Sequence, residues 1–188
     1  YGGECRGESR GTFFVSEAST LRGSSYRVKM AICAKAHENR EEKRMSKVAI
    51  VYWSGTGHTK KMAEAVKAGA ESKGAEVTLF APADFDGAKV QLFDAIAFGC
   101  PAYGAQMGAE VLEELEFQPM FDRVKGALDG KKVALFGSWG WGNGAWMNDW
   151  AAACKEAGVL MQHEPVICKE EPDEAALAAC KELGASLI

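Results

Sequence analysis

Closely spaced cysteine pairs are missing from this 188-residue chain, although it holds six cysteines. None forms a Cys-x-x-Cys pair, so we expect neither a zinc nor an iron–sulfur centre and interpret the cysteines as free thiols. Long apolar runs are also absent, because none approaches the about 20 residues that span a bilayer. Free thiols in an acidic chain are typical of a reducing compartment. We therefore expect a cytoplasmic protein without a metal site.

Positive charge is scarce in most of the chain. From Met45 onward there are 13 Lys and Arg residues against 20 Asp and Glu residues, a formal charge of −7. Nucleic acid and anionic membranes attract basic surfaces, so neither is expected as a partner. The charge favours docking to basic faces of other proteins, and we expect a monomer that docks in this way.

Residues 1–44 differ from the rest of the chain. They are net basic, begin with Tyr1 and show no apolar periodicity. Two interpretations stay open: a disordered tail, or upstream sequence read through ahead of a true start at Met45. The second rests on residues 41–44, Glu-Glu-Lys-Arg, which purine-rich codons resembling a bacterial ribosome-binding site can encode. On either interpretation, residues 45–188 form the folded domain and the tail is dispensable.

The domain alternates short apolar runs with longer helical stretches, a pattern typical of an α/β fold with a parallel sheet and helices on both faces. The expected strands are residues 47–53, 75–80, 95–99, 132–137 and 160–168. The expected helices are residues 59–73, 110–126, 147–157 and 173–185. Five strands in this sequence predict the doubly wound order 2-1-3-4-5, whose ligand crevice lies at the carboxyl ends of strands one and three.

The first expected strand runs into Ser54-Gly-Thr-Gly-His-Thr59 and then into a helix. Backbone N–H groups, hydroxyls and the helix dipole converge there, which favours a bound phosphate. A Walker loop is excluded because no Gly-Lys-Ser/Thr follows, and Lys60 replaces the third glycine of a dinucleotide fingerprint. An ordinary helix cap explains one hydroxyl better than three.

The segment from Ile50 to Val66 resembles the flavodoxin signature through Ile50, Val51, Tyr52, Ser54, Gly57, Thr59, Ala63 and Val66. His58 stands where that family often has Asn, and we expect a backbone role there. The resemblance extends over residues 45–188 and is to short-chain, bacterial flavodoxins. It implies a flavodoxin-like fold with FMN as the cofactor.

Three loops are implied to bind FMN. Their residues are Ser54, Gly55, Thr56, Gly57, His58 and Thr59; Pro101, Ala102, Tyr103, Gly104 and Gln106; and Ser138, Trp139, Gly140, Trp141, Gly142 and Asn143. The resemblance implies that Trp141 stacks on the outer face of the flavin ring and the turn at residues 102–104 on the inner face. Gly104 is expected at positive φ, turning its carbonyl toward the reduced ring. Either Gln106 or Glu110 contacts the pyrimidine edge.

For Trp146, Met147 and Trp150, the spacing indicates a buried helix face.

The expected function is that of a low-potential one-electron carrier with non-covalently bound FMN and no catalytic residues of its own. Redox partners would dock at the flavin edge, near the acidic run Glu113-Glu-Leu-Glu116. The alternative is an NAD(P)H-dependent FMN or quinone reductase of the same fold, which needs room over the flavin for a second substrate. A signalling receiver needs an acidic cluster after strand one, where Trp53-Ser54 stands instead.

Overall fold

The computed structural model describes residues 44–104 and 110–188, and the chain divides into two units, Tyr1–Arg44 and Met45–Ile188. Except for Arg44, the first unit lies outside the described residues, so the expectations about residues 1–44 stay predictions. Everything below concerns the second unit. Within the described ranges, no helix is both long and apolar enough to cross a membrane.

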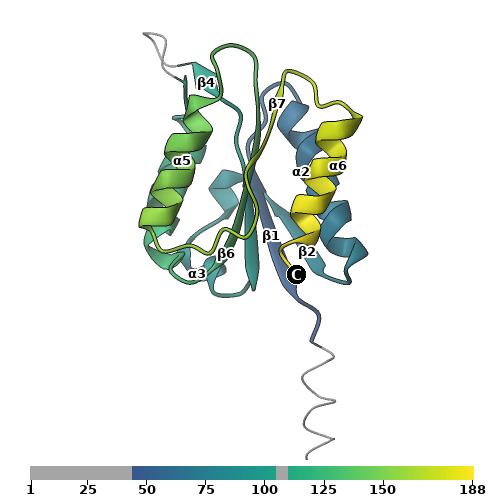
Figure 1. Ribbon diagram of the computed structural model, residues 1–188. Coiled ribbons are helices and arrows are strands. Elements are labelled where there is room, and N and C mark those ends of the chain that lie inside the picture. The colour runs from purple at the N-terminus through teal and green to yellow at the C-terminus, as the bar shows by residue number, and fades with distance from the viewer. Residues whose placement is uncertain (1–43, 105–109) are drawn as a thin grey trace, which may run out of the picture. The chain divides into compact units, whose positions relative to one another are not determined.

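A five-stranded parallel sheet forms the centre of the second unit, in the order β2-β1-β3-β6-β7 (Figure 1). Its strands are β1 (Lys47–Tyr52), β2 (Glu76–Phe80), β3 (Ala95–Gly99), β6 (Lys132–Trp139) and β7 (Val166–Lys169). In chain order this is 2-1-3-4-5, so the predicted doubly wound fold is confirmed. The three central strands are buried along nearly their whole length, which explains their unbroken apolar runs.

Helices cover both faces of the sheet (Figure 1). Helices α2 (His58–Ser72) and α6 (Glu174–Ala185) pack side by side on one face. The other face carries α3 (Gly87–Val90), α4 (Phe117–Val124) and α5 (Ala145–Glu156), with the short 3-10 turns η1 (Pro82–Asp84) and η2 (Lys125–Ala127). Helices α2 and α6 approach closely at Gly184, which has no side chain. A Cβ at this position would collide with the backbone of Val66.

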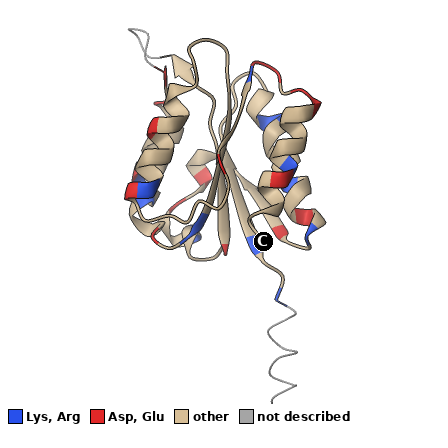
Figure 2. Cartoon of the chain, viewed as in Figure 1, with Lys and Arg blue, Asp and Glu red and all other residues tan. Residues whose placement is uncertain are grey.

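Each face of the sheet has its own apolar core. Ile50 and Phe136 meet Met62 and Leu183 on the side of α2 and α6. The opposite core is aromatic, and it includes Trp146, Met147 and Trp150, each only 2 % exposed, as the sequence predicted. Charged residues lie mainly on the helices and loops, while the strands carry few (Figure 2).

The register brings the strand ends level at the carboxyl edge. Tyr52 of β1 pairs with Gly99 of β3, and Gly99 pairs with Phe136 of β6. Strand β6 continues to Trp139, beside β7. The loops that follow these strands therefore start from one edge, which is where the doubly wound fold places its ligand crevice.

Two expected elements were wrong in part. The helix predicted at residues 110–126 begins only at Phe117, because Glu110–Val111 forms strand β5, paired with strand β4 (Tyr103–Gly104). The strand predicted at residues 160–168 is a single bridge at Leu160 and a separate strand from Val166. Between them lies Met-Gln-His-Glu-Pro, five residues that include a run of three polar ones and a proline that cannot donate to a ladder.

Candidate functional site

A cavity of about 270 Å³ opens where the loops after β1, β3 and β6 meet. Its lining residues are Trp53, Gly55, Thr56, His58, Pro101, Ala102, Tyr103, Ser138, Trp139, Gly140 and Glu170. All except Trp53 and Glu170 were predicted to bind FMN. Its volume is near the lower end of small-molecule sites, so a flavin held here keeps part of its ring at the surface.

The loop of residues 54–59, called the phosphate loop below, is held in shape from within. The hydroxyl oxygen of Ser54 accepts hydrogen bonds from the backbone N–H of Gly57, at 3.1 Å, and of Lys60, at 3.3 Å. Gly57 has φ of 93°, in the left-handed region that glycine adopts without strain. Ser54 therefore shapes the loop through its hydroxyl, and Gly57 permits the turn into α2.

Thr59 ties the phosphate loop to the loop after β6. Its side chain is 1 % exposed, and its hydroxyl lies 3.3 Å from the Ser138 hydroxyl, which is also buried. These two predicted residues are far apart in the chain, yet their buried hydroxyls meet at the carboxyl edge of the sheet. The contact fixes the start of α2 against the end of β6.

The phosphate loop leaves backbone donors open. Among the described residues, the backbone N–H groups of Gly55, Thr56, His58 and Thr59 have no hydrogen-bond partner. Helix α2 runs for 15 residues and has no acidic residue in its first turn. Unpaired donors at the positive end of a long helix bind an anion well, so the residues present fit a phosphate group.

Aromatic side chains line the cavity or lie beside it, and the Trp53 ring packs against Gly55 of the phosphate loop. Trp53 and Tyr103 meet edge to face, with ring centroids 5.8 Å apart. Tyr103 is 40 % exposed and Trp141 is 44 % exposed. Exposed aromatic rings beside a cavity provide stacking surface for a flat ligand. The loops of residues 101–104 and 138–143 are called the ring loops below.

Gly104 joins the two ring loops by close approach. A Cβ on Gly104 would lie 3.0 Å from the ring of Trp141. Gly104 lies in β4 and is not among the described glycines with positive φ. In this structure the close approach of Trp141 favours glycine here, and the expected turn of the Gly104 carbonyl in the reduced protein stays a prediction.

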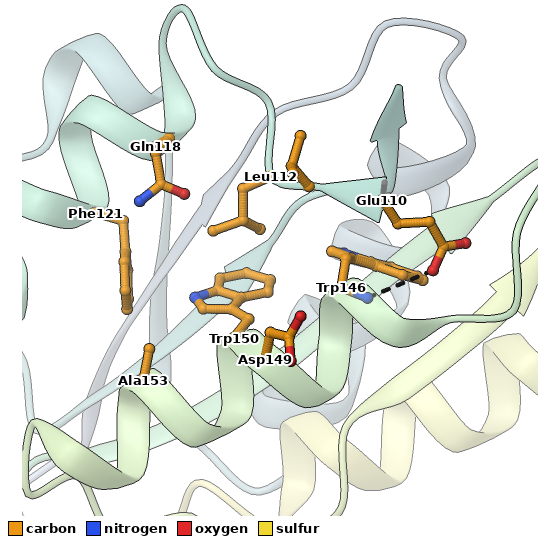
Figure 3. Close-up of a pocket in the computed structure, with 9 residues that line it drawn as sticks. Glu110, Leu112, Gln118, Phe121, Trp146, Asp149, Trp150 and Ala153 are labelled. Atoms are coloured by element: carbon orange, nitrogen blue, oxygen red, sulfur yellow. Dashed lines mark hydrogen bonds between the residues drawn. The ribbon is translucent and has the colours of Figure 1, made fainter. Parts of the chain in front are cut away.

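Glu110 caps α5. Its carboxylate accepts the backbone N–H of Ala145 at 2.6 Å and of Gly144 at 3.2 Å. It also accepts the backbone N–H of Trp146 at 3.4 Å, the contact drawn in Figure 3. The same carboxylate fills the space that a Cβ on Gly142 would need. Glu110, one of two candidates for the pyrimidine edge, thus links β5 to the turn that carries Trp141. The other candidate, Gln106, lies outside the described residues.

The acidic run after β5 does not form the expected surface in full. Glu113 is 2 % exposed, and its carboxylate accepts the backbone N–H groups of Leu115, Glu116 and Phe117 at 2.8–2.9 Å. It is therefore the buried cap of α4. Its own N–H contacts the Cys100 sulfur, and burial raises the pKa of the Cys100 thiol far above its ordinary value. Only Glu114 and Glu116 remain exposed for docking.

The described predicted residues that do not line the cavity belong to the same loops as those that do. Trp141 and Asn143 are exposed, and the Asn143 side chain accepts the N–H of Ala145 at 3.2 Å. Gly142 has φ of 92° in the same turn. The loops are shaped by the remaining residues: Ser54 and Thr59 through their hydroxyls, and Gly57 and Gly104 through their lack of a side chain.

Two lining residues were missed by the sequence reasoning. Trp53 follows β1, and Glu170 follows β7 with φ of 57°, rare for a residue with a side chain. Beside Glu170, the Lys169 ammonium lies 5.5 Å from the ring centre of Trp139, a cation–π contact. Their position in the sequence could have indicated them. Lys169 ends strand β7 and Glu170 follows it, at the same carboxyl edge where the other loops begin.

A second cavity, of about 210 Å³, lies between α4 and α5 (Figure 3). Its base is core: Trp150 makes edge-to-face contacts with Phe117 and Phe121, and its indole N–H has no partner among the described residues. Of the residues expected at the flavin, Glu110 alone lines it, and none from the phosphate loop or the ring loops does. No group of three or more His, Cys, Asp or Glu in the described part of the chain could hold a metal ion.

A doubly wound sheet with a hydroxyl-rich loop and two aromatic loops at its carboxyl edge is the arrangement of an α/β protein that binds a flavin nucleotide. Residues 50–184 match the Flavodoxin family model. The flavodoxin of Clostridium beijerinckii is 44 % identical over 67 % of this chain and 88 % of its own length. The flavodoxin of Megasphaera elsdenii is 42 % identical over 73 % of this chain and 95 % of its own. The chain belongs to the flavodoxin family.

A solved structure supports the same assignment. The solution structure of two-electron reduced Megasphaera elsdenii flavodoxin matches with a TM-score of 0.67 and 41 % identity, over 74 % of this chain and 97 % of that one. FMN is the cofactor of this family, so the cofactor expected from the sequence is confirmed. Which residues bind it stays a prediction that the cavity makes specific.

Proposed function

We propose that this protein is a low-potential one-electron carrier that holds FMN non-covalently at the carboxyl edge of its sheet. The observation that carries the proposal is the meeting of the unpaired donors of the phosphate loop with the exposed aromatics of the ring loops around one cavity. FMN supplies the redox chemistry when bound. The protein's residues bind it, orient it and set its potential.

The phosphate loop binds one end of the cofactor. The N–H groups of Gly55, Thr56 and His58 donate to the phosphate, and Ser54 keeps the loop in the shape that presents them. Because these donors have no partner within the described residues and the Ser54 hydroxyl already shapes the loop, little reorganisation opposes the cofactor. This loop should therefore supply most of the selectivity for a phosphorylated flavin.

The ring loops hold the other end. Trp141 packs on the outer face of the ring, while Ala102 and Tyr103 limit its inner face. Glu170 adds a carboxylate to a body of formal charge −7. Negative charge around the ring opposes the addition of further negative charge, which lowers the reduction potential.

Redox partner proteins would meet the cofactor where its edge is exposed. Tyr103 and Trp141 are exposed, and Leu115, which is 83 % exposed, lies between the exposed acidic residues Glu114 and Glu116. Docking to a basic partner should slow as ionic strength rises toward 0.15 M, where the Debye length is about 8 Å. A rate independent of salt would oppose this mode of docking.

We infer that the protein is a monomer in the cytoplasm. The free thiols Cys100, Cys154, Cys168 and Cys180 support a reducing compartment.

A reductive titration tests the carrier against the reductase alternative. The purified protein is reduced stepwise with dithionite while its visible spectrum and potential are recorded. A carrier should take up its two electrons in two steps with well-separated midpoint potentials. A single two-electron step, together with oxidation of NADH or NADPH at a rate that depends on the protein, would reject the carrier and favour the reductase.

A further inference from the structure

Charge inside the cavity is distributed unevenly. Of the described residues that line it, His58 is the one basic side chain and Glu170 the one acidic side chain. A phosphate monoester carries nearly two negative charges at neutral pH, because its second pKa is about 6. The phosphate loop therefore faces a strongly charged group with a single side chain that can become positive.

The neighbouring lysines have other positions. Lys61 forms an ion pair with Glu171, and both side chains are more than half exposed. Lys60 is exposed and does not line the cavity, although its backbone N–H helps to hold the Ser54 hydroxyl. Lys169 lies over the ring of Trp139. None of these ammonium groups stands in for His58 at the cavity wall.

We propose that His58 is a specificity-determining residue of the phosphate loop: its imidazole, when protonated, faces the FMN phosphate and makes FMN binding tighter at lower pH. The proposal rests on the proposed placement of the phosphate in residues 54–59. It assigns a side-chain role to a position where the resemblance implied only a backbone contact.

Charged groups of both signs lie around His58. The loop after β7 carries Glu170, which lines the cavity, and Glu171, which pairs with Lys61. The pKa of Glu171 is lowered chiefly by Lys61 and to a smaller extent by His58, which places the imidazole within electrostatic reach of that carboxylate. Lys60, Lys61 and the positive end of α2 are the positive groups next to His58 along the chain.

Bound phosphate adds two negative charges to the side that favours protonation. Binding therefore takes up a proton, and affinity must rise as pH falls through the range in which histidine titrates, between about pH 5 and 8. Below about pH 6 the phosphate itself loses charge, which ends the gain. The effect should thus be largest near pH 6 and vanish above pH 8.

The experiment measures the dissociation constants of FMN and riboflavin by flavin fluorescence, using the full chain freed of its cofactor, at about pH 6.3 and 8.5. His58→Asn removes the titrating group, and His58→Lys keeps a positive charge at both pH values. We expect the ratio of wild-type to His58→Asn affinity for FMN to rise about fivefold from the higher to the lower pH. His58→Lys should show no such rise, and riboflavin should bind all three proteins alike at both values.

Two outcomes oppose the inference and differ in what they reject. If FMN binds more tightly than riboflavin but the wild-type to His58→Asn ratio is the same at both pH values, His58 has no charge role and the phosphate loop still stands. If FMN and riboflavin bind equally to every variant, the placement of the phosphate in residues 54–59 is wrong. Far-UV spectra of each variant at both pH values exclude unfolding as a cause.

Discussion

The phosphate loop and the ring loops share one cavity but are built differently. The phosphate loop is fixed by hydrogen bonds of its own residues. The Ser54 hydroxyl accepts two backbone N–H groups, and the buried Thr59 hydroxyl contacts the buried Ser138 hydroxyl. The ring loops carry exposed aromatics, and one carboxylate, that of Glu110, fixes the turn after β6. A preformed loop contributes affinity, whereas an exposed one contributes contact with partners.

The largest effect should come from removing the phosphate. Riboflavin should bind at least about 100-fold more weakly than FMN, since the loss of two or more hydrogen bonds to a charged group costs about 1.5–3 kcal/mol each. Fluorescence titration of the cofactor-free protein measures both constants. Equal affinity would remove the distinction between the two regions altogether.

Thr59 sharpens this result. Thr59→Ala removes the hydroxyl that meets Ser138, so the start of α2 loses its tie to β6. FMN affinity should fall about tenfold, the equivalent of about 1.4 kcal/mol, while riboflavin affinity changes little. Thr59→Ser keeps the hydroxyl and is the matched control. If both substitutions weaken riboflavin as much as FMN, the contact supports the whole edge rather than the phosphate loop.

The next effect concerns Glu110 and the ring loops. Glu110→Ala removes the acceptor of the Gly144 and Trp146 N–H groups and leaves Ala145 with Asn143 alone, so the free energy of unfolding should fall by about 2 kcal/mol. Denaturant unfolding measures the change. Glu114→Ala, an exposed neighbour, should stay within about 0.5 kcal/mol of wild type. A Glu110→Ala protein as stable as Glu114→Ala would mean that the Trp141 turn is held by other contacts.

Gly104 should have a smaller effect that is confined to the ring side. Gly104→Ala places a methyl group against the Trp141 ring, and the resulting shift should cost about 1 kcal/mol of flavin affinity. FMN and riboflavin should weaken by the same factor. Gly126→Ala, whose Cβ would meet nothing within 4 Å, is the control. A loss seen with FMN alone would place Gly104 in phosphate binding instead.

The fold was largely predictable because its signals are local and strong. Strand β3 matched its predicted bounds, since a strand buried on both faces must be apolar throughout. The helix predicted from residue 110 failed for a different reason. Leu112 and Phe117 are both buried, but the Glu113 carboxylate accepts three backbone N–H groups, and the helix begins only at Phe117. The hydrogen bonds of the Glu113 side chain therefore determined where the helix begins, which the pattern of apolar residues did not reveal.

The candidate site was predictable where a motif marked it and not elsewhere. Residues 54–59 join a strand to the start of a helix and carry three hydroxyls, so a role in phosphate binding could be proposed from the sequence. The pairing of Thr59 with Ser138, and of Glu110 with the N-terminus of α5, joins segments distant in the chain. No spacing rule connects such residues. Only the parallel register that brings the strand ends to one edge reveals them.

The smallest effect should come from Lys169, which lies between the two regions. Its ammonium lies 5.5 Å from the ring centre of Trp139, a cavity-lining residue, and its side chain is exposed. Lys169→Gln should weaken FMN and riboflavin about equally, by about two- to threefold, because an exposed cation–π contact contributes about 0.5–1 kcal/mol. Lys169→Arg should retain wild-type affinity, since guanidinium also packs on aromatic faces. A larger loss for FMN than for riboflavin would mean that the Lys169 charge reaches the phosphate, so that both regions share one electrostatic field and His58 is not its only positive source.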